Sequence, residues 1–172
     1  MINSIMRYSL VFILLLFLQV LLFDNINFGG YINPFVYIMF IMLLPVELPG
    51  WILLLVSFFT GLFMDFFSGT TGMNAGASVA AGFARPYILR IISPRDGYEP
   101  GAAPSMLIYG FRWFLTYSIL IVAVHHFVLF FLEVFRLADF FRTILRIILS
   151  SAFTISFIVL IEYYRRGTFT RK

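Results

Sequence analysis

The chain has 172 residues, of which 62% are hydrophobic and 20% aromatic, while only 12% are charged. Soluble domains have about 45–50% apolar and about 25% charged residues, so a soluble chain of this composition would expose large apolar patches and aggregate. The composition therefore predicts a protein that folds in a lipid bilayer. The net charge is +4 and there are no cysteines, which excludes disulfides and thiolate metal sites.

Six stretches are apolar enough to predict membrane-spanning helices, because a span needs about 20 mostly apolar residues. Short polar turns separate them, and the longest polar loop covers residues 93–104. No small-residue cleavage site follows the first stretch, so we expect it to be retained as a span. The expected fold is an all-α polytopic membrane protein with a single domain, residues 1–172. The predicted spans are residues 5–23, 32–48, 51–67, 71–92, 105–132 and 144–164.

The basic residues predict the orientation, because Arg and Lys concentrate on the cytoplasmic side. With a cytoplasmic N-terminus, eight of these residues fall at inner ends and three at the outer side, so we expect both termini to be cytoplasmic. Their placement between and beyond apolar runs is typical of contacts with anionic lipid rather than with nucleic acid. The outer three recur with two acids at three- or four-residue steps, which predicts an interfacial helix. These residues are Glu133, Arg136, Asp139, Arg142 and Arg146.

Asp65 is an ionisable residue near the end of the third predicted span. Such a residue costs about 2.5–3.5 kcal/mol inside a membrane, so it faces protein, water or the interface. Three interpretations are open. Asp65 lies at the headgroups or caps the following turn, it locks the third span to a neighbour or receives a partner, or it belongs to a proton or ion relay.

Four further ionisable side chains are candidates for polar contacts within the membrane: Arg112, His125, His126 and Glu162. Arg112 lies near the inner end of the fifth predicted span and either extends to the headgroups or pairs with Glu162 or Glu47. His125 and His126 are adjacent, so on a helix they point about 100° apart and cannot both serve one metal ion without other ligands. We expect them to be satisfied within the bundle or to form a hydrogen bond with an acid at the same depth, Asp65.

The fourth predicted span has a face with almost no side chains. Gly72, Gly76, Ala80 and Ala84 recur every four residues, and a second row contains Ser78 and Gly82. In lipid, close packing of such faces is a main source of helix association. The face is predicted to pack inside the chain or to receive a helix of another protein.

Motifs that carry catalysis are absent from the sequence. It has no phosphate-binding glycine loop with Lys, no nucleophile elbow and no His–Glu zinc helix, and no span holds paired carboxylates. We therefore expect a protein that is not an enzyme and that has no cofactor or metal.

The segment GLFMDFFSGTTGMNAGASVAAGFARPYIL, residues 61–89, and the order of the spans resemble the MreD family, the small integral-membrane rod-shape-determining proteins of bacteria. The resemblance covers nearly the whole chain. Asn74 stands where relatives are expected to carry a bulkier residue such as His. The residues that carry the resemblance are Gly61, Asp65, Gly69, Gly72 and Ala75, followed by the small-residue helix through Arg85 and Pro86. The residues expected to serve partner or helix packing are Asp65, Gly69, Gly72, Gly76, Ala80, Arg85 and Pro86.

The resemblance implies a non-enzymatic scaffold of the cell-elongation machinery in the bacterial cytoplasmic membrane. Such a scaffold binds the single-span protein MreC and helps to couple MreB filaments to the transpeptidase and glycosyltransferase of lateral wall synthesis. The six-helix arrangement also resembles the substrate-binding subunits of energy-coupling-factor transporters. That second resemblance implies an alternative, a small molecule held between spans at the outer face near Asp65, Asn74, His125 and His126.

Overall fold

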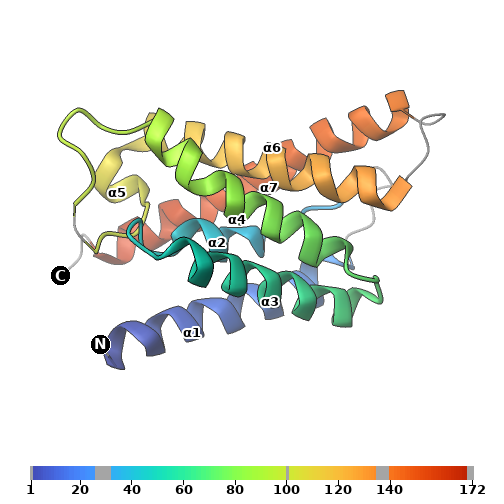
Figure 1. Ribbon diagram of the computed structural model, residues 1–172, viewed down its shortest axis with the longest axis horizontal. Helices are drawn as coiled ribbons and strands as arrows, with labels where there is room; N and C mark the ends of the chain where they lie inside the picture. The colour runs from blue at the N-terminus through green and yellow to red at the C-terminus, as the bar shows by residue number, and fades with distance from the viewer. Residues whose placement is uncertain (1, 26–31, 100, 135–139, 170–172) are drawn as a thin grey trace.

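The computed structural model describes residues 2–25, 32–99, 101–134 and 140–169 (Figure 1). These residues form helices and no strand, so the expected all-α class is confirmed for this part of the chain. The helices are α1 (Ile2–Leu18), the π-helical turn η1 (Gln19–Phe23), α2 (Ile38–Leu43), α3 (Gly50–Ser68), α4 (Met73–Ile91), α5 (Met106–Tyr109), α6 (Phe111–Val134) and α7 (Phe140–Phe169).

Three of these helices are long and apolar enough to cross a membrane. They are α3, α6 and the part of α7 over Phe140–Arg165. A shorter apolar helix covers Tyr8–Phe23. The fourth long helix, α4, has as many residues as α3, but its Gly, Ala and Ser residues make it less apolar.

The long helices run lengthwise beside one another (Figure 1). α4 packs against both α3 and α6, and α6 packs against α7, while α1 lies along the edge of the bundle (Figure 1). The short helix α2 lies inside, and all six of its residues are buried. The first turns of α1, the loop after α4 and the last turns of α7 lie at one end of the bundle, and the turn between α3 and α4 lies at the opposite end (Figure 1).

The second predicted span is not a continuous helix. Only Ile38–Leu43 is helical, and residues 33–35 have no regular structure. Pro34 lacks an N–H group, and Pro45 disfavours helix in the residue before it, where Leu44 is extended (ψ 153°). The second predicted span therefore consists of irregular backbone at residues 33–35, followed by the six-residue helix α2.

Two other expectations differ from the structure. The fifth predicted span is divided at Gly110, whose φ of +84° separates α5 from α6. The predicted interfacial helix is replaced by the ends of two long helices, because Glu133 lies in the last turn of α6 and Arg142 and Arg146 in the first turns of α7. Arg136 and Asp139 lie outside the described residues.

α3 and α4 approach most closely at two glycines. A Cβ atom added to Gly61 would lie 2.5 Å from the Cα atom of Ala75. One added to Gly82 would lie 3.0 Å from the Cβ atom of Ser57 and nearer still to its Oγ atom. Neither position has room for a side chain, so these two glycines set the spacing that places the polar side chains described next.

Candidate functional site

The irregular segment 33–37 receives polar side chains from the helices around it. The π-helical turn contains Gln19, whose side chain is 1% exposed. Its Oε1 atom accepts hydrogen bonds from the N–H groups of Val36 (2.7 Å) and Tyr37 (3.3 Å), and its Nε2 group donates to the carbonyl of Pro34 (2.8 Å). A single amide therefore satisfies three backbone groups that no helix satisfies.

α7 supplies the remaining partners of this segment. Ser150 accepts from the N–H group of Asn33 and Thr154 from that of Phe35, both over 3.0 Å. Lipid offers no hydrogen bonds, so irregular backbone at membrane depth requires protein partners of this kind. The two hydroxyls and Gln19 explain how an apolar bundle tolerates a broken helix in its interior.

Two histidines of α6 connect this segment to its neighbours. His125 and His126 are each 0% exposed. The Nε2 atom of His125 lies 2.7 Å from the Tyr37 hydroxyl, and the Nε2 atom of His126 lies 3.1 Å from Oγ1 of Thr154. The two Nδ1 atoms are 3.4 Å apart. The adjacent rings thus reach different elements, the turn before α2 and helix α7, and also contact each other.

Tyr37 continues the network to α4 and α3. Its hydroxyl donates to Oδ1 of Asn74 (3.2 Å) and lies 3.3 Å from Oγ of Ser78. The side-chain amide of Asn74 donates to Oδ1 of Asp65 (3.2 Å). The expected direct contact between a histidine and Asp65 is therefore replaced by a path through Tyr37 and Asn74.

Asp65 binds the N-terminus of α4. Its carboxylate accepts from the backbone N–H groups of Asn74 (3.0 Å) and Ala75 (2.9 Å) and from the Thr70 hydroxyl (2.5 Å). The first N–H groups of a helix have no partner within it and favour a negative charge. Asp65, which is 3% exposed, supplies both a hydrogen-bond acceptor and a negative charge from the preceding helix, α3. We call the connected set the polar layer: Gln19, Tyr37, Asp65, Asn74, His125, His126 and Thr154.

Arg85 binds the C-terminal end of α2, the end away from Tyr37. Its side chain is 1% exposed, and its Nε group donates to the Tyr117 hydroxyl (2.9 Å). Its terminal nitrogens donate to the carbonyls of Leu44 and Pro45. Carbonyl groups at the end of a helix favour a positive charge, so Arg85 does for the end of α2 what Asp65 does for the start of α4. Pro86, beside it, has an exposed side chain.

Glu162 and Arg112 do not form the ion pair that was one of the expectations. Glu162, which is 2% exposed, accepts from the N–H group at the start of α5, Met106 (3.2 Å), and pairs with Arg165 (2.8 Å). Arg112 is exposed in the first turn of α6, and Glu47 is exposed as well. The second expectation for Arg112, a side chain that extends outward, fits this position.

The two predicted rows of small residues on α4 contact different neighbours. The first row contains Gly72, Gly76, Ala80 and Ala84, and the second contains Ser78 and Gly82. Gly69 and Gly72 end α3 and begin α4 with φ of +66° and +82°, a conformation that favours glycine. A Cβ atom on Gly76 would meet Leu132 of α6 at 3.1 Å, and Ala80 is half-buried. The close contact with α3 is made instead by Gly82 of the second row, which faces the side chain of Ser57. The second row therefore packs against α3, whereas the first row is only partly covered, with Gly72 exposed and Gly76, Ala80 and Ala84 half-buried.

The sequence interpretation missed three members of the polar layer. Gln19 has a clear signal, since it is the lone amide within an apolar run, and a buried amide needs partners. Tyr37 and Thr154 have none, because hydroxyl side chains also occur throughout apolar segments without such partners.

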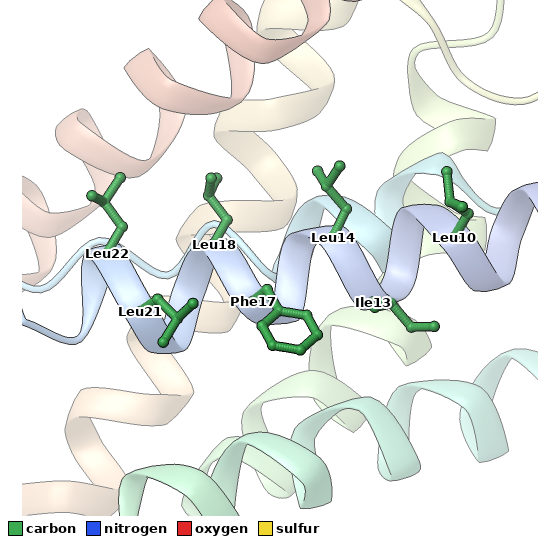
Figure 2. Close-up of a pocket in the computed structure, with 7 residues that line it drawn as sticks. All are labelled: Leu10, Ile13, Leu14, Phe17, Leu18, Leu21 and Leu22. Atoms are coloured by element: carbon green, nitrogen blue, oxygen red, sulfur yellow. The ribbon is translucent and has the colours of Figure 1, made fainter.

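α1 presents an apolar surface at the edge of the bundle (Figure 2). A hollow of about 590 Å³ lies along it, lined by residues of α1 and of the π-helical turn η1 that continues it, and Figure 2 shows their side chains on two sides of the helix. A second groove of about 400 Å³ separates α1 from α3 and has no polar lining. The residues lining the hollow are Leu10, Ile13, Leu14, Phe17, Leu18, Leu21 and Leu22.

The chemistry of the polar layer is that of a connector. Its acid, its two imidazoles and its amides bond to one another or to backbone groups. In the part of the chain that the structure describes, no three His, Asp or Glu side chains are placed to hold a metal ion. The layer joins η1, the turn before α2, α3, α4, α6 and α7 through side chains.

The fold and this layer define an all-helical protein that contains three helices able to cross a membrane and a closed network of polar side chains. No protein-family model matches the chain, and no curated protein or solved structure matches it.

Proposed function

We propose that this chain is an MreD-like, non-enzymatic scaffold of the bacterial cell-elongation machinery. It crosses the cytoplasmic membrane six times, with residues 32–48 as a broken second crossing and α4 as the fourth, and both termini are cytoplasmic. It binds an MreC-like single-span protein and helps to couple MreB filaments to the transpeptidase and glycosyltransferase of lateral peptidoglycan synthesis.

One observation carries the proposal that the chain acts as a scaffold. The acidic and imidazole side chains that the described part of the bundle buries are already bonded within the chain: Asp65 to the start of α4, His125 and His126 to Tyr37 and Thr154, and Glu162 to α5. Catalytic and ligand-binding groups need access to a substrate. The resemblance of residues 61–89 to the MreD family supplies the biological setting.

A second candidate function is that of a substrate-binding subunit in an energy-coupling-factor-type transporter. The observation in its favour is the broken second segment, because transporters build binding sites from discontinuous helices near the membrane centre. Several helices also direct polar groups to this segment, as they would to a ligand.

Affinity purification of the tagged full chain from its native membrane in mild detergent separates the two candidates. The scaffold predicts co-purification of an MreC-like single-span protein, and the transporter subunit predicts an ATPase module. Recovery of the ATPase module without the single-span protein would reject the scaffold.

A further inference from the structure

The hydrogen bonds of the polar layer have a direction that is fixed at both ends. At one end the backbone N–H group of Phe35 can only donate, and it donates to Thr154. At the other end an ionised carboxylate can only accept, and Asp65 accepts from Asn74. Each group between them has to receive on one side and donate on the other.

The position of the proton on His126 follows from its neighbours. Its Nδ1 atom lies 3.1 Å from the carbonyl of Val122, which can only accept, so Nδ1 carries the hydrogen. In a neutral ring Nε2 is then bare and accepts from the Thr154 hydroxyl at 3.1 Å. The hydroxyl can donate in this direction because its oxygen already accepts from Phe35.

His125 has the opposite arrangement. Its Nδ1 atom faces the Nδ1–H group of His126 at 3.4 Å, so it is bare. Its Nε2 atom carries the hydrogen and donates to the Tyr37 oxygen at 2.7 Å, and Tyr37 donates to Asn74. Two neutral rings with protons on different atoms therefore satisfy the whole path.

We propose that His125 and His126 form a neutral latch, which these two tautomers close and one additional proton opens. A proton on Nδ1 of His125 would point at the N–H group of His126. A proton on Nε2 of His126 would deprive the Thr154 hydroxyl of its acceptor. Either event weakens the attachment of α6 to segment 33–37 or to α7. This effect lies within the chain and does not depend on which partner protein it binds.

The surroundings keep an added proton on the histidine pair. Tyr37 bonds directly to His125, but the next group on the path is the amide of Asn74, which does not readily pass a proton to Asp65. Arg146 of α7 lies 4.8 Å from the ring of Phe130, which lies 5.8 Å from that of His126. The charged groups that these contacts connect to the surroundings of α6 are Asp65 after this amide, Arg146 behind Phe130, Arg85 on Tyr117 and Asp24 on Gln19. The elements around α6 also carry Arg90 on α4 and Arg142, Glu162 and Arg165 on α7.

The first test is nitrogen NMR of the full chain with labelled histidine in lipid nanodiscs at pH 7.5. The chain contains two histidines, and both belong to the latch, so each imidazole signal reports on it. We expect one ring protonated on Nε2 and the other on Nδ1, with His125→Gln removing the first signal and His126→Gln the second. A cationic ring, or the same tautomer at both positions, would overturn the proposal.

The second test is the melting temperature as a function of pH. Unfolded histidines take up protons below about pH 6.5, whereas the closed latch does not, so stability is present at neutral pH and is lost as the pH falls. For two histidines we expect Tm to drop by about 4–8 °C between pH 6.5 and 5.5. Wild-type protein with a constant Tm over this range would contradict the latch.

Matched variants assign the pH effect to the two rings. Glutamine has a donor and an acceptor but does not titrate, so the variant with both His125→Gln and His126→Gln should lose less than half as much Tm between these pH values. The single His125→Gln variant should show an intermediate loss and serves if the double variant does not fold. Thr154→Val should lower Tm at both pH values and retain the pH-dependent loss. A double variant that loses as much Tm as the wild type would overturn the proposal.

Discussion

Arg85 and Tyr117 together bind one carbonyl end of α2. The Nε group of Arg85 donates to the Tyr117 hydroxyl over 2.9 Å, and that hydroxyl donates to the carbonyl of Met42 over 3.0 Å. The two residues come from α4 and α6, so three elements meet at this point. Asp65 binds the N-terminus of α4 and Arg85 projects from its C-terminal half, so two buried charges join this helix to its neighbours.

The first prediction concerns this pair. Arg85→Met and Tyr117→Phe remove groups that bond to each other and to the same end of α2, so their effects on the free energy of unfolding should not add. We expect a coupling energy of about 0.5–3 kcal/mol in a double-mutant cycle, measured by unfolding in mixed detergent micelles. Arg90 is exposed on the same helix, so Arg90→Met with Tyr117→Phe serves as the control and should be additive. Additive effects for the Arg85 pair would contradict the shared role.

The second prediction concerns the charge of Asp65. Asp65→Asn keeps one acceptor for the N–H groups of α4 but turns an amide toward others, so it should cost about 1–3 kcal/mol. Asp65→Leu leaves those buried donors without a partner and should cost more. Asp96, exposed in the loop after α4, is the control, and either substitution there should be near neutral. If Asp65→Asn were as damaging as Asp65→Leu, the charge of the Asp65 carboxylate would matter beyond the hydrogen bonds that it accepts.

The third prediction ranks three glycines. Gly61→Ala should be the most destabilising, by about 1–3 kcal/mol or more, because the new methyl group meets the backbone of α4. Gly82→Ala meets the side chain of Ser57, whose Oγ has no hydrogen-bond partner, so Ser57→Gly should restore much of its stability. Gly76→Ala meets only the end of Leu132 and should be mild. Thermal unfolding in detergent gives the order. A strongly destabilising Gly76→Ala would contradict this ranking and would place the tight contact at the first row.

The fourth prediction concerns the proposed orientation. Thr71 and Asp96 are exposed in the turns that precede and follow α4, and they belong to opposite ends of the bundle (Figure 1). The chain has no cysteine, so single cysteines can be placed at either position without further changes. An impermeant maleimide added to intact cells should label position 71 and spare position 96. The reverse labelling pattern would invert the proposed topology.

The sequence predicts the regular helices well and the broken one poorly. The limits of α3 and α4 lie within two residues of the predicted ones because Pro49, Gly69 and Gly72 mark helix ends. The break before α2 is hidden, because an apolar run reads as a helix whether or not its backbone bonds are internal. The groups that replace those bonds lie on other elements, among them Gln19 and Thr154, and no local pattern connects them. The count of six spans stays a prediction.

The candidate site was also predictable only in part, because the sequence shows which residues are unusual in an apolar segment but not which residues they contact. Asp65, His125 and His126 are conspicuous as ionisable residues in apolar segments, and Gln19 could have been added on that basis. Their partners could not be predicted, because the path from His125 to Asp65 passes through Tyr37, which is 88 residues away in sequence from the histidine.

The bonds from segment 33–37 to α7 also fix the order in which the protein can be completed during synthesis. The N–H group of Asn33 has its partner only once Ser150, 117 residues later in the chain, has been made, and at about 5–20 residues per second this takes roughly 6–23 s. Until then the segment carries unsatisfied backbone groups, which lipid does not accommodate. We therefore expect the nascent chain to hold this segment at the membrane surface or inside the translocation machinery, and to take it into the bundle only after α7 has been made.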